Sequence, residues 1–119
     1  MKKLSIITVT YNSEKYLAEC IESVIGQTYP NIEHIIIDGK SKDATVSIIQ
    51  KYSNHIARWV SETDRGMYDA INKGLELASG DFVGILNSDD MLDTPEVIAA
   101  IVKAFEENNT DAVYGDLEY

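Results

Sequence analysis

The 119 residues of this chain suit a single domain, and with 45% hydrophobic residues the chain is globular rather than disordered. The formal net charge of −10 and the isoelectric point of about 4.4 argue against broad binding to nucleic acids or anionic membranes, because both need a basic face. An anionic ligand would therefore need local help from a metal ion, a helix N-terminus or a few basic side chains.

The cysteine content and the apolar runs bear on the compartment. Cys20 is the only cysteine, which excludes an intrachain disulfide and suits a reducing environment, so we expect a cytoplasmic protein. Cys20 falls on the apolar face of a predicted helix and is interpreted as a core residue. The apolar N-terminal segment is too short for a signal peptide, and no apolar run approaches the roughly 18 residues of a membrane span.

Strands and helices alternate from the N-terminus. Residues 4–9 form the first predicted strand, and the helix after it is expected to be capped by Asn12 or Ser13 and to end at Gly26. Residues 34–37 form a second, buried strand.

The second half of the chain repeats this alternation. The next helix is expected to bury Val46, Ile49 and Tyr52, and the following strand, residues 56–61, is less apolar and should occupy an exposed position in the sheet. A third helix then has an apolar side with four members: Tyr68, Ile71, Leu75 and Ala78.

The last predicted elements surround a pair of acids. Residues 82–86 form a strand that is apolar throughout, as a strand buried on both faces is. A helix start at residues 94–96 combines a cap, a proline and an acid, and residues 111–114 form a last strand. This alternation predicts an α/β fold, a Rossmann-like, mostly parallel sheet flanked by helices, in one domain over residues 1–119.

Four acids directly follow predicted strands: Asp38, Asp64, Asp89 and Asp90. The carboxyl ends of parallel strands share one edge, and ligands of open α/β sheets bind there. The adjacent carboxylates of Asp89 and Asp90 repel each other, and a divalent cation that prefers oxygen ligands would relieve this repulsion. Loops are polar, so one or two acids at this edge would need no functional explanation. Four acids at one edge favour a ligand-binding site.

Several common sites are absent from the sequence. No G-x-G-x-x-G turn follows the first strand and no P-loop motif occurs, so a dinucleotide site and a P-loop site are not expected. His34 and His55 have no nearby cysteine and are interpreted as structural or surface residues rather than zinc ligands. The remaining chemistry is an acidic edge with Arg65 and Lys73 beside it, which fits a nucleoside diphosphate held with a metal ion that neutralises the leaving group.

Motifs along nearly the whole chain resemble the family 2 glycosyltransferases of the GT-A fold, most closely the bacterial O-antigen, capsule and exopolysaccharide branch. The resemblance rests on short segments that occur in order at suitable spacing: residues 5–12, 19–30, 36–39, 61–66, 68–74 and 78–90. It implies transfer of a sugar, with inversion, from a nucleotide-diphosphate donor to a glycan or lipid-linked acceptor.

The resemblance also implies roles for individual residues. Thr8 and Tyr11 would line the base pocket, Asp38 would bond the base, and Asp64 would face the nucleotide. Arg65 or Lys73 would approach the phosphates. Residues 88–90 correspond to the family's D-x-D signature, in which Ser88 replaces the first Asp, Asp89 would contact the ribose or donor sugar, and Asp90 would hold Mn²⁺ or Mg²⁺.

Two departures from the family pattern stand out. The turn after the second strand has Lys40, Lys42 and Ala44 where the family has a small residue, Thr and Gly. Family members continue past the position of Tyr119 through an acceptor-binding half, so the catalytic base is expected beyond this chain, with Asp116 and Glu118 as candidates only by default.

Two other functions remain open on the sequence. The first is a binding module that retains the nucleotide but does not transfer a sugar. The second is a phosphoacceptor receiver domain. A receiver needs acids after its first strand, and residues 8–12 contain none. Two partners are expected besides the donor and the acceptor. The full enzyme is expected to associate peripherally with a membrane. A second copy of the chain is also expected to bind, because an exposed sheet edge or apolar patch favours self-association.

Overall fold

The computed structural model describes residues 2–107 and the backbone of residues 114–116. Its centre is a five-stranded sheet in the order β3-β2-β1-β4-β5, in which every neighbouring pair is parallel. The strands are β1 (Leu4–Thr10), β2 (Ile32–Asp38), β3 (Arg58–Ser61), β4 (Phe82–Ile85) and β5 (Tyr114–Asp116). The parallel sheet confirms the predicted α/β class.

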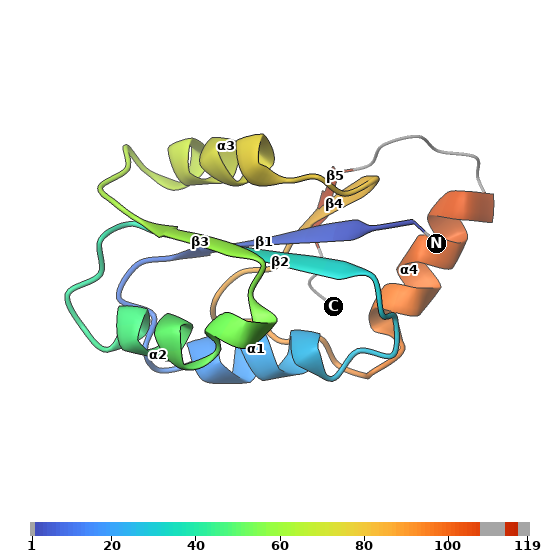
Figure 1. Cartoon of the computed structure of the whole chain (residues 1–119), viewed down its shortest axis with the longest axis horizontal. Coiled ribbons are helices and arrows are strands. Elements are labelled where there is room, and N and C mark those ends of the chain that lie inside the picture. The colour runs from blue at the N-terminus through green and yellow to red at the C-terminus, as the bar shows by residue number, and fades with distance from the viewer. Residues whose placement is uncertain (1, 108–113, 117–119) are drawn as a thin grey trace.

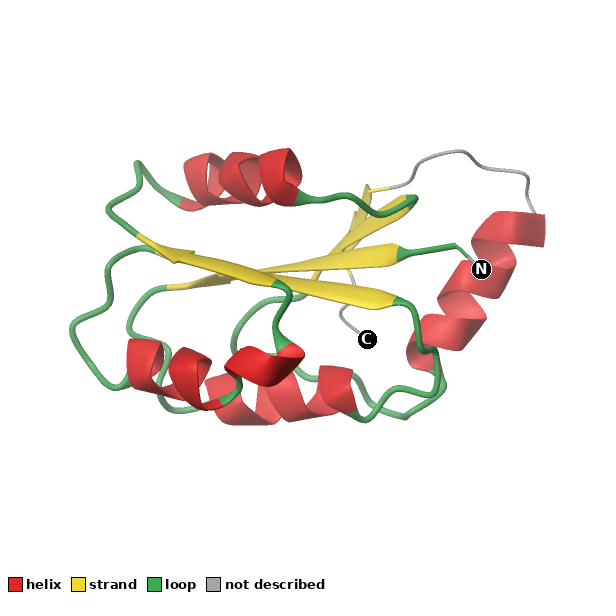
Figure 2. Cartoon of the chain, viewed as in Figure 1, coloured by secondary structure: helices red, strands yellow, loops and turns green. Residues whose placement is uncertain are grey.

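Helices cover both faces of this sheet (Figure 1, Figure 2). They are α1 (Leu17–Ile25), α2 (Thr45–Lys51), α3 (Met67–Leu77) and α4 (Val97–Glu107), with a short 3-10 turn at Ser53–His55. Figure 1 shows α3 on one face, α1 and α2 on the other, and α4 at the end where the N-terminus lies. Strands β1 to β4 therefore run away from α4, toward the opposite end of the molecule.

Alternation along β1 and β2 divides the core between the two faces. Leu4 and Ile6 pack with Cys20 of α1 and Ile98 of α4, all fully or almost fully buried. On the same face Ile36 packs with α1 and α2 residues, whereas Ile35 and Ile37 pack on the other face against Ala70 of α3. The second strand is buried on both faces, as its continuous apolar run predicted.

The structure corrects the expected face of α3. Tyr68 is 85% exposed, and the residues that α3 buries against the sheet are Ala70 and Gly74. A Cβ atom at Gly74 would lie 2.6 Å from Cγ2 of Ile7, so the helix approaches β1 more closely than any larger residue permits. The apolar pattern of the sequence predicted the wrong face because small residues, not bulky ones, form the contact between α3 and the sheet.

The other elements agree with the sequence apart from their ends. Strand β3 lies at the edge of the sheet and is partly exposed, as predicted. Helix α1 begins at Leu17 without a side-chain cap, so neither Asn12 nor Ser13 caps it. Of the predicted last strand, residues 111–113 lie outside the described residues, and the observed strand is Tyr114–Asp116.

Candidate functional site

Two cavities lie at the edge where the strands finish. The larger, which we call the Ser88 cavity, has a volume of about 500 Å³, and the smaller, the Asp64 cavity, about 340 Å³. The Ser88 cavity is lined by Val9, Asn12, Ser13, Lys15, Tyr16, Met67, Asn87, Ser88 and Asp89. The Asp64 cavity is lined by Tyr11, Gly39, Lys40, Lys42, Thr63 and Asp64. The loop after β1 contributes to both.

Hydrogen bonds join the loops that carry these cavities. The backbone N–H of Asn12 donates to Oγ of Ser41 at 2.7 Å, and the N–H of Lys42 donates back to Oδ1 of Asn12 at 2.9 Å. Asn12 has a left-handed backbone (φ 48°), which asparagine tolerates better than most residues. Oγ of Ser88 lies 3.0 Å from Oγ of Ser13, which ties the loop after β4 to the loop after β1.

Asp38 lies inside this network rather than in a cavity. Its side chain is completely buried, and it accepts hydrogen bonds from the hydroxyls of Thr10, Ser41 and Ser61 and from the N–H of Ser41, at 2.5–2.8 Å. Burial by itself would raise the pKa of Asp38, but these hydrogen bonds outweigh it and hold the pKa below the ordinary carboxyl value. In this conformation Asp38 fixes the turn after β2, and its contact with a base stays a prediction.

Asp89 and Asp90 have the opposite environment. Within the described part of the chain, no side chain or backbone group donates a hydrogen bond to either carboxylate, and neither forms an ion pair. Their loop is a turn closed by the N–H of Asp90, which donates to the carbonyl of Asn87 at 3.1 Å. Two unpaired adjacent carboxylates fit a hard divalent cation, which a protein often binds through one or two carboxylates and the ligand's phosphates.

No third acidic, histidine or cysteine ligand joins them, because the described residues contain no group of three such side chains able to hold a metal ion. The donor set therefore fits an ion that completes its coordination with water and a bound phosphate, not a closed structural site.

Tyr11 and Asp64 border the same gap. A Cβ atom added to Gly39 would lie 3.0 Å from Oδ2 of Asp64 and 3.4 Å from Cδ1 of Tyr11. Glycine at this position thus keeps the space between the carboxylate and the aromatic ring open. Oδ1 of Asp64 accepts the N–H of Gly66 at 3.1 Å, which orients the carboxylate.

Lys73 and Arg65, the two residues predicted to approach the phosphates, differ in their contacts. Lys73 is 3.2 Å from the carboxylate of Glu62 and 3.8 Å from that of Asp69, and it donates to the carbonyl of Thr63 at 3.2 Å. This ammonium group therefore holds the Glu62–Asp64 loop against α3. Arg65 is exposed, and its described hydrogen bond runs from its backbone N–H to Asp69 at 3.0 Å.

Thr8 belongs to a buried polar chain below the cavities. Its hydroxyl is 2.9 Å from Nε2 of His34, and Cys20 donates a weak hydrogen bond to the carbonyl of Asn87, at 3.6 Å. Burial lowers the pKa of His34 to about 4. Burial also raises the pKa of Cys20 to about 12, and the charges of Asp90 and Asp89 add to the increase. Thr8 thus lies behind the site, and its contact with a base stays a prediction.

The predicted set and the cavities overlap in part. Tyr11, Asp64, Ser88 and Asp89 line the cavities, whereas Thr8 and Asp38 are buried behind them. The sequence did not assign the other lining residues, although all lie within five positions of a residue that it did assign: Val9, Asn12, Ser13, Lys15, Tyr16, Gly39, Lys40, Lys42, Thr63, Met67 and Asn87.

Comparison with known proteins defines the class to which this fold and edge belong. Residues 5–119 match the profile described as "Glycosyl transferase family 2", so the chain belongs to that family. An uncharacterised glycosyltransferase of Mycobacterium tuberculosis is 41% identical over 102 residues, which cover 85% of this chain and 39% of the relative. The glycosyltransferase GlyA of Streptococcus pneumoniae is 32% identical, over 96% of this chain and 16% of the relative.

Solved structures of the same class carry nucleotide sugars. TarS of Staphylococcus aureus, in complex with UDP-GlcNAc, superposes with a TM-score of 0.83 at 31% identity, over 90% of this chain and 32% of TarS. The mannosyltransferase PcManGT of Pyrobaculum calidifontis, in complex with GDP-Man and Mn²⁺, gives a TM-score of 0.82 at 27% identity, over 87% of this chain and 32% of PcManGT.

The chain spans under half the length of these relatives. Among residues 2–107 and 114–116, no helix is both long and apolar enough to cross a membrane.

Proposed function

We propose that the chain is the nucleotide-sugar-binding part of an inverting, metal-dependent glycosyltransferase that acts on a glycan or lipid-linked acceptor. The observation that carries the proposal is the pair of unpaired carboxylates, Asp89 and Asp90, on the turn beside the Ser88 cavity. The complexes of TarS with UDP-GlcNAc and of PcManGT with GDP-Man and Mn²⁺ support the ligand class.

In this proposal each cavity takes one part of the donor. The base enters the Asp64 cavity against Tyr11, and the sugar and diphosphate enter the Ser88 cavity. There the hydroxyl of Ser88 donates or accepts hydrogen bonds and the carboxylate of Asp89 accepts them. Asp38 and Thr8 hold the strand ends in place from behind. Asp64 contacts the nucleotide, and Arg65 and Lys73 supply positive charge at the rim.

Asp90, with Asp89 beside it, would hold Mn²⁺ or Mg²⁺. A bound divalent ion would neutralise the nucleoside diphosphate as it leaves. The protein's own contribution is to orient the donor so that an acceptor hydroxyl attacks in line, which gives inversion in one displacement. The general base that removes the hydroxyl proton is not assigned to a described residue.

The second candidate function is nucleotide-sugar binding without turnover. The partial coverage keeps this alternative, because the match extends over only 39% of the mycobacterial relative and 32% of TarS. A turnover assay with radiolabelled UDP-, GDP- and dTDP-sugars separates the two, since a binding module releases no nucleotide.

Substitution of Asp90 tests the metal site directly. In calorimetry with UDP, GDP and dTDP, the wild-type protein should bind at least one nucleotide more tightly with Mn²⁺ than without it. Asp90→Ala should abolish the gain from Mn²⁺, because it removes the carboxylate assigned to the ion. The exposed Asp93→Ala is the matched control, since it removes the same charge three residues away, and it should keep the gain.

Two results would contradict the proposal. If no nucleotide binds the wild-type protein with or without Mn²⁺, the assignment of the edge as a donor site fails. If Asp90→Ala and Asp93→Ala keep the same metal-dependent gain, the donor site stands but the metal assignment to Asp90 fails.

A further inference from the structure

The Asp64 cavity contains hydrogen-bonding groups that have no partner in the protein. Oδ1 of Asp64 accepts the N–H of Gly66, but no described residue donates to Oδ2. Lys40 and Lys42 line the same cavity, and in the described part of the chain neither ammonium group forms an ion pair or a hydrogen bond. In a protein with a net charge of −10, two unpaired lysines beside one cavity are unexpected.

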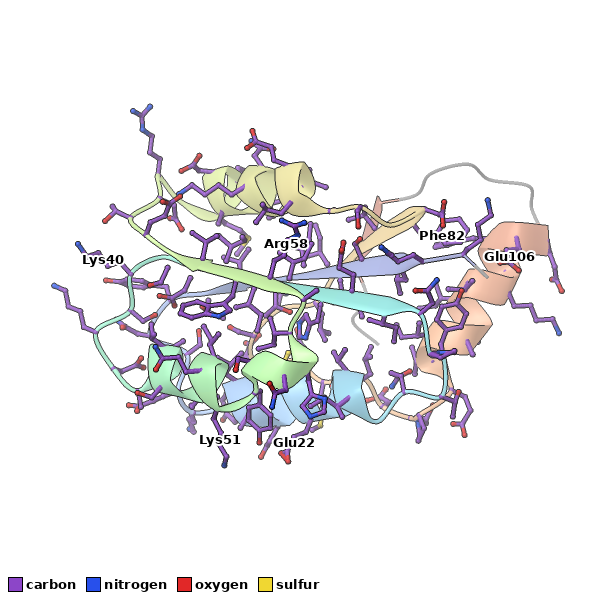
Figure 3. The ribbon with its side chains drawn as sticks, in the orientation of Figure 1. Glu22, Lys40, Lys51, Arg58, Phe82 and Glu106 are labelled. Atoms are coloured by element: carbon purple, nitrogen blue, oxygen red, sulfur yellow. The ribbon has the colours of Figure 1, made fainter. Side chains whose placement is uncertain are left out.

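These groups come from three loops and line one cavity. The aromatic ring of Tyr11 and the carboxylate of Asp64 approach each other across Gly39, where an added Cβ would be 3.0 Å from Oδ2 of Asp64. Lys40 and Lys42 belong to the turn after β2. Figure 3 shows Lys40 at the end of the molecule away from α4. A planar ring stacked on Tyr11 would lie in the cavity that Asp64 and the two lysines also line.

The chemistry of the three side chains defines the edge they complement. An ionised aspartate only accepts hydrogen bonds, and a lysine only donates them. One acceptor with two donors matches a ring N–H that lies between two carbonyl groups. Uracil and thymine have this edge at N3. Cytosine and adenine instead have an unprotonated ring nitrogen there, whose lone pair would face the carboxylate, and guanine has a single carbonyl beside its ring N–H.

We infer that Lys40 and Lys42, acting with Asp64, are specificity residues that select a uracil or thymine nucleotide as the donor's leaving group. The inference rests on the proposed donor site and narrows its range of ligands, because the donor site as proposed above does not distinguish one nucleoside diphosphate from another. It also explains why the turn departs from the family pattern at these two positions.

Calorimetry with UDP, dTDP, GDP, CDP and ADP at saturating Mn²⁺ tests the inference. The wild-type protein should bind UDP or dTDP about tenfold or more tightly than the other three, since hydrogen bonds to a base edge discriminate to that extent. The double variant Lys40→Met, Lys42→Met should reduce this preference to about threefold or less. The control Lys51→Met, Lys103→Met changes the net charge equally at exposed positions on α2 and α4 and should keep it.

Uridine and cytidine separate base reading from phosphate attraction, because neither carries a phosphate. The wild-type protein should prefer uridine, and the Lys40→Met, Lys42→Met variant should lose this preference. Equal weakening of all five nucleotides with an unchanged uridine preference would overturn the inference, as would a wild-type preference for GDP, CDP or ADP. Absence of all nucleotide binding would instead overturn the proposed donor site, and the inference with it.

Discussion

Asp38 and Asp90 show that the same residue type at the same sheet edge serves two purposes. Asp38 is fully buried and accepts four hydrogen bonds, whereas the carboxylate of Asp90 has no hydrogen-bond partner among the described residues. The sequence correctly placed both at the carboxyl edge of the sheet, although Asp38 is the last residue of β2 and does not follow it. It could not distinguish them, because the donors to Asp38 come from three separate segments around Thr10, Ser41 and Ser61 that meet only in the folded chain.

Replacement of Asp38 should therefore affect stability in a pH-dependent way. The folded-state pKa of Asp38 is lowered, so its stabilising effect is present above the unfolded carboxyl pKa of about 4 and is lost as the pH falls through the folded value. Asp38→Asn should lower the free energy of unfolding at pH 7 by about 1.5–3 kcal/mol. Its stability should also fall less steeply than that of the wild type on acidification below about pH 4.

Urea titrations at pH 7, 5, 4 and 3 measure both effects. Asp93→Asn is the control, since the Asp93 side chain is exposed and lacks a described partner. An acid slope for Asp38→Asn as steep as that of the wild type would show that this carboxylate does not contribute to acid unfolding.

Cys20 is buried in α1 as predicted, and α4 begins at Val97, directly after the predicted helix start at residues 94–96. The predicted face of α3 was wrong. Helix α3 instead packs through Ala70 and Gly74, and its bulky Tyr68 is exposed. Apolar periodicity identifies faces by side-chain size, so a close contact made by small residues gives a misleading signal.

The close packing of α3 predicts that Gly74→Ala is destabilising. Alanine favours the helix by about 1 kcal/mol over glycine, but its Cβ would approach Cγ2 of Ile7 to 2.6 Å, and such overpacking costs about 1–3 kcal/mol. We expect a lower midpoint of thermal unfolding, measured by circular dichroism. Gly26→Ala is the control, because its Cβ would make only an ordinary contact, at 3.4 Å from the carbonyl of Glu22. A higher midpoint for Gly74→Ala would mean that α3 is free to move away from β1.

Over the whole molecule, exposed apolar side chains gather at the edge that carries the cavities. Six large hydrophobic side chains of the described residues are exposed, and all except Ile25 belong to the loops or the helix start around the cavities: Tyr11, Tyr16, Met67, Tyr68 and Met91. The sequence predicted the sheet, its edge and the acids on it. It did not predict this concentration, because exposure depends on how the loops pack on one another.

The buried contact between Cys20 and the carbonyl of Asn87 has a kinetic consequence. The thiol is inaccessible and its pKa is raised to about 12, so a thiol reagent can react only when the segment above it opens. Labelling of the folded protein should therefore be far slower than labelling in urea. A nucleotide bound with Mn²⁺ should slow it further, by the factor with which the ligand stabilises the closed form. Mass spectrometry of this one thiol would thus report how often the structure that buries it opens.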